Sequence, residues 1–124
     1  MKITTRYYGP VAIMDLSGKL TLGKGDVALR GRLLELLDEG IKNIIINLKE
    51  LKVMDSSGLG ELIRCRTTCS QHGAELKLLN LTPKVYDLLE VTRLIGVFEI
   101  YTEEAEAIPS FWHEESAPKE KDDG

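Results

Sequence analysis

The stretch Met54-Asp55-Ser56-Ser57-Gly58-Leu59-Gly60-Glu61 stands where an apolar segment gives way to a helical pattern. The segment before it, Ile44-Ile45-Ile46-Asn47-Leu48, is short and rich in β-branched residues, and it predicts a strand buried on both faces. About ten residues with helical spacing of apolar side chains follow from Leu62 onward. Because Asp and Ser are preferred helix caps, we expect a strand-to-helix junction here.

Two glycines in the first turn of this predicted helix break the local propensity, since each costs roughly 1 kcal/mol against alanine. A helix cap requires neither Gly58 nor Gly60. We therefore expect them to leave an open patch of backbone beside the exposed hydroxyls of Ser56 and Ser57, which a partner could approach closely. On this interpretation, a bulky residue at either glycine weakens partner binding more than it weakens folding.

Length and composition predict one soluble globular domain. The chain has 124 residues, of which 43% are hydrophobic and 29% are charged. A net charge of −4 and the lack of a stripe of Lys and Arg argue against direct binding to nucleic acid. The sequence shows no signal-peptide pattern and no run of about 18 apolar residues that could span a membrane. We expect a cytoplasmic protein.

Hydrophobic periodicity predicts the element order β-β-α-β-α-β-α-β-α. The strands expected at 2–8 and 11–16 form a hairpin around the turn Gly9-Pro10. The later elements are a glycine-rich loop at 18–25, a helix from Asp26 to Gly40, a strand at 43–48, a helix from Ser57 to Gly73, a strand at 76–80, a helix opened by Thr82-Pro83, a strand at 97–101, and a short helix after Thr102 that Pro109 ends or kinks.

This alternation predicts an α/β fold in which a mixed sheet of about five strands is covered by helices. We expect the domain to occupy residues 1–113. Residues 114–124 are rich in charged residues and lack an apolar period, so they are predicted to form a disordered acidic tail.

A catalytic role for Ser56 would need a base within hydrogen-bond reach. His72 lies sixteen residues further along the same predicted helix, which places it about 24 Å away. Spacing leaves His113 open as a base, but the order Ser-Ser-Gly-Leu-Gly is not a nucleophile elbow. From spacing alone, Ser56 fits a simple cap and a modified serine equally well, and Ser57 fits a simple cap.

Two other patterns suggest binding chemistry, and each has a simpler interpretation. The stretch from Gly18 to Gly25 resembles a phosphate-binding loop, but Gly25 stands where the motif needs Ser or Thr after Lys24, which favours a plain connection. Cys65, Cys69 and His72 share one helix face at metal-ligand spacing. No second cluster completes a metal site, so we expect the cysteines to pack in the core.

The sequence Asp55-Ser56-Ser57-Gly58-Leu59-Gly60 resembles the signature of STAS-domain anti-sigma factor antagonists. The resemblance extends from about Val11 to Ala107. The further segments that carry it are Gly18-Lys19-Leu20, Asn47-Leu48, Gly73-Ala74-Glu75-Leu76 and Leu88-Leu89-Glu90-Val91-Thr92-Arg93-Leu94. It implies a mixed sheet with helices mainly on one side, and a protein without enzyme activity or a cofactor of its own.

In this family the first serine after the aspartate accepts a phosphoryl group, and that position is Ser56. The donor is a partner serine kinase that is also the anti-sigma factor and supplies its own ATP, and a metal-dependent serine/threonine phosphatase restores the free form. The unphosphorylated antagonist binds the anti-sigma factor and frees a sigma factor. The resemblance thus implies a partner-binding set of Asp55, Ser56, Ser57, Gly58, Leu59, Gly60 and Thr21.

Thr21 marks a departure from the family, because some antagonists carry an acidic residue at this point after the Gly-x-Leu element. The loop from Thr21 to Asp26 therefore bears on which kinase is recognised. Three other functions remain as alternatives: a STAS scaffold or lipid-transport accessory domain without phosphorylation, an enzyme that uses Ser56 with His113, and a nucleotide-binding module built on Gly18 to Lys24.

Overall fold

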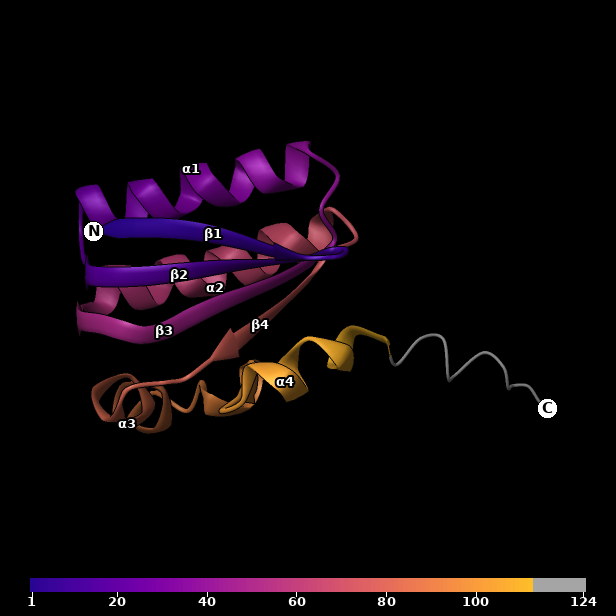
Figure 1. Ribbon diagram of the computed structural model, residues 1–124. Helices are drawn as coiled ribbons and strands as arrows, with labels where there is room; N and C mark the ends of the chain where they lie inside the picture. The colour runs from indigo at the N-terminus through magenta and orange to yellow at the C-terminus, as the bar shows by residue number, and fades with distance from the viewer. Residues whose placement is uncertain (113–124) are drawn as a thin grey trace.

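The computed structural model describes residues 1–112, which form one mixed sheet with helices on both faces (Figure 1). The predicted tail at 114–124 and His113 lie outside the described residues. The elements, in chain order, are β1 (Lys2–Tyr8), β2 (Val11–Leu20), α1 (Lys24–Asp38), β3 (Asn43–Met54), α2 (Ser56–Gln71), β4 (Glu75–Leu79), α3 (Pro83–Val91), the 3-10 turn η1 (Ile95–Val97), β5 (Glu99–Tyr101), α4 (Glu104–Ala107) and the 3-10 turn η2 (Pro109–Trp112).

Within the described residues 1–112, the sheet has five strands in the spatial order β1-β2-β3-β4-β5. β1 and β2 form the predicted antiparallel hairpin, in which Tyr8 lies opposite Val11 and Gly9 takes a positive φ of 56° in the turn. The pairs β2–β3, β3–β4 and β4–β5 are parallel. The predicted α/β class and strand number are confirmed.

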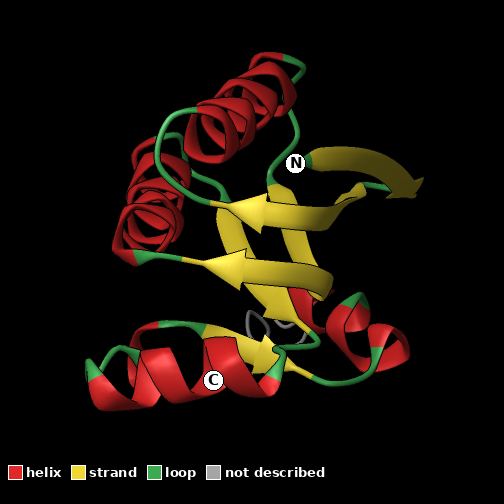
Figure 2. Ribbon diagram, turned by 90° about the vertical axis from the view of Figure 1, so that its left-hand side faces the viewer, coloured by secondary structure: helices red, strands yellow, loops and turns green. Residues whose placement is uncertain are grey.

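Helices cover the two faces of the sheet unequally. Ile44 and Ile46 of β3 point into the larger core, where the apolar faces of α1, α2 and α3 meet the sheet. Ile45 points the other way, into a smaller core closed by Ala107 and Phe111 of α4 and η2. Figure 2 shows α1 and α2 together on one side of the sheet and α4 on the other. β3 is therefore the predicted central strand, and most of the helical cover lies on one side.

β2 is longer than predicted, because it continues through Leu20 instead of ending at Leu16. Two register shifts let it follow β3 past the glycine, so that Gly18 pairs with Leu51 and Leu20 with Met54. The expected loop at 18–25 is thereby reduced to the residues between Leu20 and Lys24, and α1 starts at Lys24 rather than at Asp26. Asp26 instead accepts a hydrogen bond from Gly23 N at 3.0 Å.

Three other strand limits also differ from the prediction. β3 extends to Met54 rather than 48, because its charged outer half still pairs with β2. β4 spans Glu75–Leu79, and Asn80 ends it with a φ of 59°. β5 is only Glu99–Tyr101, because Val97 belongs to the preceding 3-10 turn.

The helix starts at Thr82-Pro83 and the break at Pro109 are confirmed. Thr82 Oγ1 accepts a hydrogen bond from Val85 N at 3.3 Å, and Pro83 occupies the first helical position. α4 ends at Ala107, and Pro109 opens η2.

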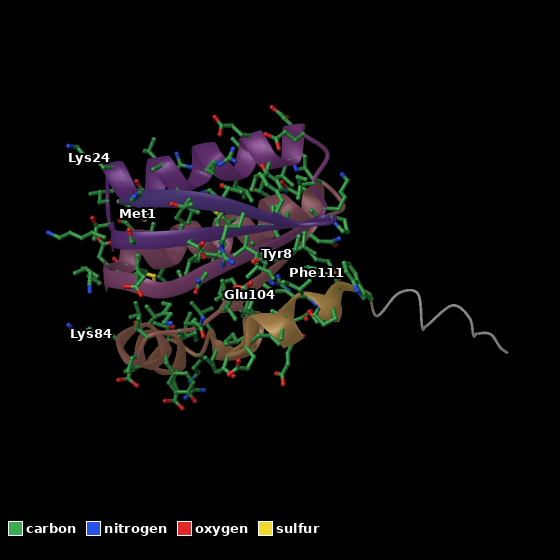
Figure 3. All side chains as sticks on the ribbon, in the orientation of Figure 1. Met1, Tyr8, Lys24, Lys84, Glu104 and Phe111 are labelled. Atoms are coloured by element: carbon green, nitrogen blue, oxygen red, sulfur yellow. The ribbon has the colours of Figure 1, made fainter. Side chains whose placement is uncertain are left out.

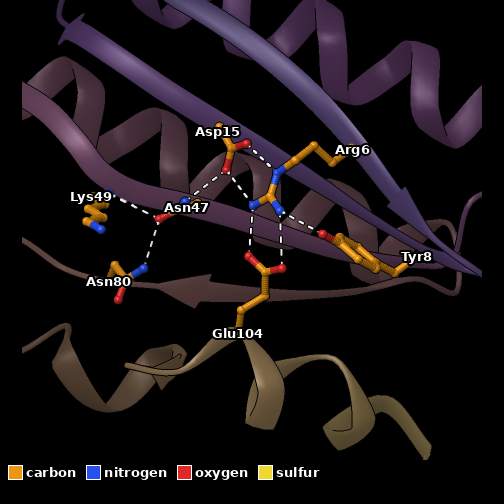
Figure 4. A network of polar contacts seen from close by, with 7 residues as sticks. All are labelled: Arg6, Tyr8, Asp15, Asn47, Lys49, Asn80 and Glu104. Carbon is orange, nitrogen blue, oxygen red and sulfur yellow. Dashed lines mark hydrogen bonds and ion pairs between the residues drawn. The ribbon is translucent and has the colours of Figure 1, made fainter.

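A polar network fastens α4 to the sheet (Figure 4). The Arg6 guanidinium on β1 donates to Asp15 on β2 at 2.6 Å and to Glu104 on α4 at 2.9 Å. Asn47 on β3 donates to Asp15 at 2.8 Å and accepts from Asn80 at 3.3 Å. Burial raises the pKa of Asp15, but the hydrogen bonds from Arg6 and Asn47 outweigh burial and hold this pKa below its ordinary value.

Candidate functional site

Asp55 forms the junction between β3 and α2. Its backbone is extended, with φ −101° and ψ −174°, while Ser56 already belongs to the helix. The Asp55 carboxylate accepts a hydrogen bond from Gly58 N at 2.9 Å, which makes Asp55 the helix cap. The capping role suggested for Ser57 is therefore wrong, and both serines lie in the first turn of α2.

Asp55 also connects α2 to the loop that follows β2. Its second carboxylate oxygen accepts a hydrogen bond from Leu22 N at 3.2 Å, so the loop containing Thr21 lies beside the start of α2. The amides of Gly58 and, less strongly, Leu22 hold the pKa of Asp55 below its ordinary value, because they bind its charged form. The structure thus brings Thr21 into the same region as the signature residues.

The two serines differ from the next two residues in their exposure. Ser56 is exposed and Ser57 is half-buried, whereas Gly58 and Leu59 are buried. Within residues 1–112, neither serine hydroxyl forms a hydrogen bond, so neither is committed to the fold. The start of α1, where Lys24 is labelled in Figure 3, lies at the end of the sheet at which β3 ends and α2 begins.

The two glycines of the signature have different surroundings. A Cβ atom at Gly58 would collide with the Leu20 carbonyl oxygen and lie 2.9 Å from the side chains of Leu20 and Met54. A Cβ atom at Gly60 would meet nothing within 4 Å. The open backbone expected at both glycines is therefore found only at Gly60, and Gly58 is required for close packing of α2 on the end of β2.

A buried charge beside the signature was not anticipated from the sequence. The Glu61 side chain is only 1% exposed, and its carboxylate accepts from Arg30 of α1 at 2.7 Å and from Arg64 of α2 at 2.9 Å. Its other oxygen contacts Cys65 Sγ at 3.7 Å. A sequence signal for this burial existed, because Glu61, Cys65 and Cys69 recur at four-residue spacing on one helix face.

The other chemical candidates that lie within the described residues are not assembled into catalytic or metal sites. Cys65 and Cys69 are buried free thiols, and burial raises the pKa of Cys69 to about 11. His72 is exposed at the far end of α2, where its Nδ1 lies 2.9 Å from the Thr68 carbonyl oxygen. Within residues 1–112, no three side chains of His, Cys, Asp or Glu gather as metal ligands. The apparent phosphate-binding loop is divided between elements, because residues 18–20 belong to β2 and Lys24 and Gly25 to α1.

The fold is that of a small α/β domain in which the signature lies at the start of α2. A profile of the STAS domain family matches residues 2–107, and the chain belongs to that family. The chain is 30% identical over 113 residues to the anti-sigma F factor antagonist of Paenibacillus polymyxa, with 87% of this chain and 92% of the relative covered.

Solved structures show the same fold. The anti-sigma factor antagonist SpoIIAA in its unphosphorylated form has a TM-score of 0.76 at 22% identity, covering 90% of this chain and 97% of that one. The phosphorylated form of the Bacillus cell fate determinant SpoIIAA has a TM-score of 0.69 at 22% identity, covering 89% and 99%. Among residues 1–112, every helix is too short or too polar to cross a membrane.

Proposed function

We propose that this protein is an anti-sigma factor antagonist controlled by phosphorylation of Ser56. In the unphosphorylated state it binds an anti-sigma factor that is also a serine kinase, and this binding frees a sigma factor. The observation that carries the proposal is the position of Ser56, an exposed residue in the first turn of α2. The 30% identity to an anti-sigma F factor antagonist and the shared fold of SpoIIAA in its phosphorylated form support it.

A phosphate on Ser56 is compatible with folding of the domain but not with binding of a partner over the start of α2. Phosphorylation adds about −1.5 to −2 charges and three strong acceptor oxygens. At the N-terminus of α2, the helix dipole and free N–H groups stabilise that charge, so the domain stays folded. Burial of the same dianion under a partner without a cationic match costs several kcal/mol.

Asp55 increases the effect on binding, because its carboxylate is ionised and adjacent to the modified serine. Since each 1.4 kcal/mol corresponds to about a tenfold change in affinity, one phosphate is enough to abolish binding. The partner surface in this proposal comprises Asp55, Ser56, Ser57 and Gly60, together with Thr21 from the neighbouring loop. Gly58 and Leu59 support that surface from below, since both are buried.

Thr21 bears on the identity of the kinase. It stands at the position where some antagonists carry an acidic residue, and its loop is fixed to the helix cap through the hydrogen bond from Leu22 to Asp55. A neutral residue there removes one negative charge from the surface beside Ser56. The partner kinase is therefore one that does not depend on an acidic residue at this position.

The remaining parts of the proposal concern the cellular setting. The antagonist has no catalytic activity or cofactor of its own, and the phosphoryl group comes from the ATP of the partner kinase. A metal-dependent serine/threonine phosphatase removes the phosphate. The protein acts in the cytoplasm through a domain at residues 1–113, without direct contact with nucleic acid or membrane.

The test combines capture and phosphorylation of variants at the two serines. Wild type and Ser56→Ala, immobilised, are expected to capture a kinase of the anti-sigma class from the source organism, and Ser56→Asp is expected to capture at least tenfold less. With the captured kinase and ATP, wild type and Ser57→Ala gain one phosphate by intact mass, whereas Ser56→Ala gains none. Ser57→Ala is the matched control, because it removes the neighbouring hydroxyl on the same helix turn.

Phosphate found on Ser57 alone would refute the assignment of the acceptor. Equal capture of the same kinase by wild type and by Ser56→Asp would refute the switch. Absence of any anti-sigma kinase from the captured proteins would favour the STAS scaffold or lipid-transport accessory role.

A further inference from the structure

The outer half of β3 has a free edge. The ladder between β3 and β4 ends at the pair Asn47–Leu79, yet β3 continues to Met54. Figure 1 shows β4 stopping well before the end of β3, with α3 following below that end. Within residues 1–112, every strand pair that β3 forms after Asn47 is with β2. Unpaired strand edges of this kind accept a strand from another chain.

A cleft runs along this free edge. It has a volume of about 250 Å³ and lies between the last residues of β3 and the first turns of α3. Leu51, Val85 and Leu88 supply apolar surface, and Val53 is 43% exposed beside them. This volume accommodates one or two apolar side chains of a bound segment.

The charges around the cleft are positive, although the chain as a whole is acidic. Lys52 and Lys84 both line the cleft and are exposed, and Figure 3 labels Lys84 at this end of the molecule. Within the described part of the chain, neither lysine forms an ion pair and no acidic side chain lines the cleft. Glu50 belongs to the same strand but is not among the lining residues. The charge that complements this cleft is therefore negative.

We propose that the edge of β3 from Leu48 to Met54, together with this cleft, binds an extended acidic segment of the anti-sigma partner as an added strand. The free N–H and C=O groups of β3 bond to the backbone of the segment, one apolar side chain enters the cleft, and acidic side chains pair with Lys52 and Lys84. Met54 lines the cleft and precedes Ser56 by two residues, so this surface is continuous with the proposed switch. The identity of the partner rests on the proposed function.

The first experiment uses the whole protein and a synthetic probe. A capped hexapeptide that alternates glutamate with valine is titrated to several millimolar into ¹⁵N-labelled protein while amide shifts and amide hydrogen exchange are recorded. We expect the largest shifts and slowed exchange at Lys52, Val53 and Met54. A peptide of alternating lysine and valine, and an acidic peptide methylated at every second amide nitrogen, are expected to bind at least tenfold more weakly.

Charge-reversal variants test the cleft itself. The double variant Lys52→Glu/Lys84→Glu is expected to weaken binding of the acidic peptide at least tenfold and to reduce capture of the anti-sigma kinase. Lys24→Glu is the matched control, because Lys24 is an exposed lysine at the start of α1 and does not line the cleft. Its peptide affinity is expected to remain within twofold of the wild type.

The two proposals fail in different ways. Absence of peptide-induced shifts along β3, or shifts confined to other surfaces, overturns the docking surface even if Ser56 behaves as a switch. Equal affinity of the double variant and Lys24→Glu for the acidic peptide overturns it as well. The converse result is peptide binding along β3 together with equal capture of the kinase by wild type and Ser56→Asp. That result supports the docking surface and refutes the proposed function.

Discussion

At the scale of single residues, replacement of Gly58 or Gly60 by alanine is expected to change stability in opposite directions, although the two positions are only two residues apart. Gly58→Ala places a methyl group against the Leu20 carbonyl, so we expect it to lower the free energy of unfolding by about 2 kcal/mol or more. Gly60→Ala meets open space in a helix, so we expect it to raise stability by up to about 1 kcal/mol. Urea denaturation of the two variants in parallel measures both effects.

The pair serves as its own control, because the chemical change is identical at both sites. Equal effects of the two substitutions on the urea midpoint would contradict the packing role of Gly58. A loss of partner capture by Gly58→Ala with an unchanged urea midpoint would restore the earlier expectation that this glycine serves binding rather than folding.

Asp55 makes stability depend on pH. The pKa of Asp55 in the folded protein lies below its ordinary value. The charged cap therefore makes its full contribution to folding stability when the pH is above the ordinary pKa, and this contribution is lost as the pH falls through the pKa of the folded protein. Asp55→Asn keeps an acceptor oxygen but cannot titrate. We expect wild type to exceed Asp55→Asn in stability by a constant amount from pH 5.5 to 7 and by a shrinking amount below about pH 4.

Urea midpoints measured from pH 3 to 7 give this difference directly. Asp15 also has a lowered pKa, but it is present in both proteins and cancels from the comparison. A difference between the two proteins that stays flat down to pH 3 would show that the charge of Asp55 does not contribute to capping.

Sequence reasoning located the junction residues but not all of their neighbours. Asp and Ser after an apolar strand are local capping signals, so Asp55 and Ser56 could be placed at a helix start from sequence alone. The contact of Leu22 with Asp55 and the burial of Glu61 and Lys77 depend on elements that are distant in the chain. Lys77 is the charged residue of an otherwise apolar strand, and its buried Nζ donates a hydrogen bond to Ser110 Oγ of η2 at 2.8 Å.

At the scale of elements, the contact between α1 and α2 contains a carboxylate shared by two arginines. Arg30→Ala or Arg64→Ala alone leaves Glu61 with one cation, so we expect each to lower stability only slightly, because both arginines are largely exposed. The double variant leaves a buried carboxylate without a cation, and we expect it to cost about 3 kcal/mol. Thermal and urea unfolding of the four proteins give the coupling energy.

Arg66→Ala is the control for removal of an arginine from α2, because Arg66 is exposed and forms no ion pair within the described residues. It is expected to leave stability within about 0.5 kcal/mol of the wild type. Additive effects of the Arg30 and Arg64 substitutions would show that the two ion pairs act independently.

Strand ends were the least predictable part of the fold. Lys49, Glu50 and Lys52 look like the end of an apolar strand, but β3 continues through them because β2 remains beside it. Likewise, Gly18 looks like the start of a loop, and a register shift keeps it within β2. Helix starts at Asp55 and Thr82 were predictable because their caps act locally, whereas strand length depends on a partner that the local sequence does not reveal.

At the scale of the whole molecule, Arg6 joins the first strand to the last helix. We expect Arg6→Ala to lower stability by about 1–2 kcal/mol, a modest value because its side chain is 33% exposed. The larger effect is expected in hydrogen exchange. Relative to the wild type, Arg6→Ala should speed the exchange of amides in residues 104–112 more than that of amides in α1. Hydrogen-exchange mass spectrometry measures both segments in one experiment.

Arg6→Lys keeps the charge but cannot donate to Asp15 and Glu104 in the same forked geometry, so partial loosening of α4 is expected. Unchanged exchange in residues 104–112 of Arg6→Ala would show that the apolar contacts of Ala107 and Phe111 hold α4 without the network.

The spatial order of the strands is the same as their order along the chain. Among residues 1–112, no strand is inserted between two earlier ones, so each strand after β1 finds its neighbour already synthesised. The large contact between β2 and β3 can form while the C-terminal third is still being synthesised, and α4 then closes the smaller core as the final addition. Assembly of this domain can therefore keep pace with translation, growing outward from the N-terminal hairpin.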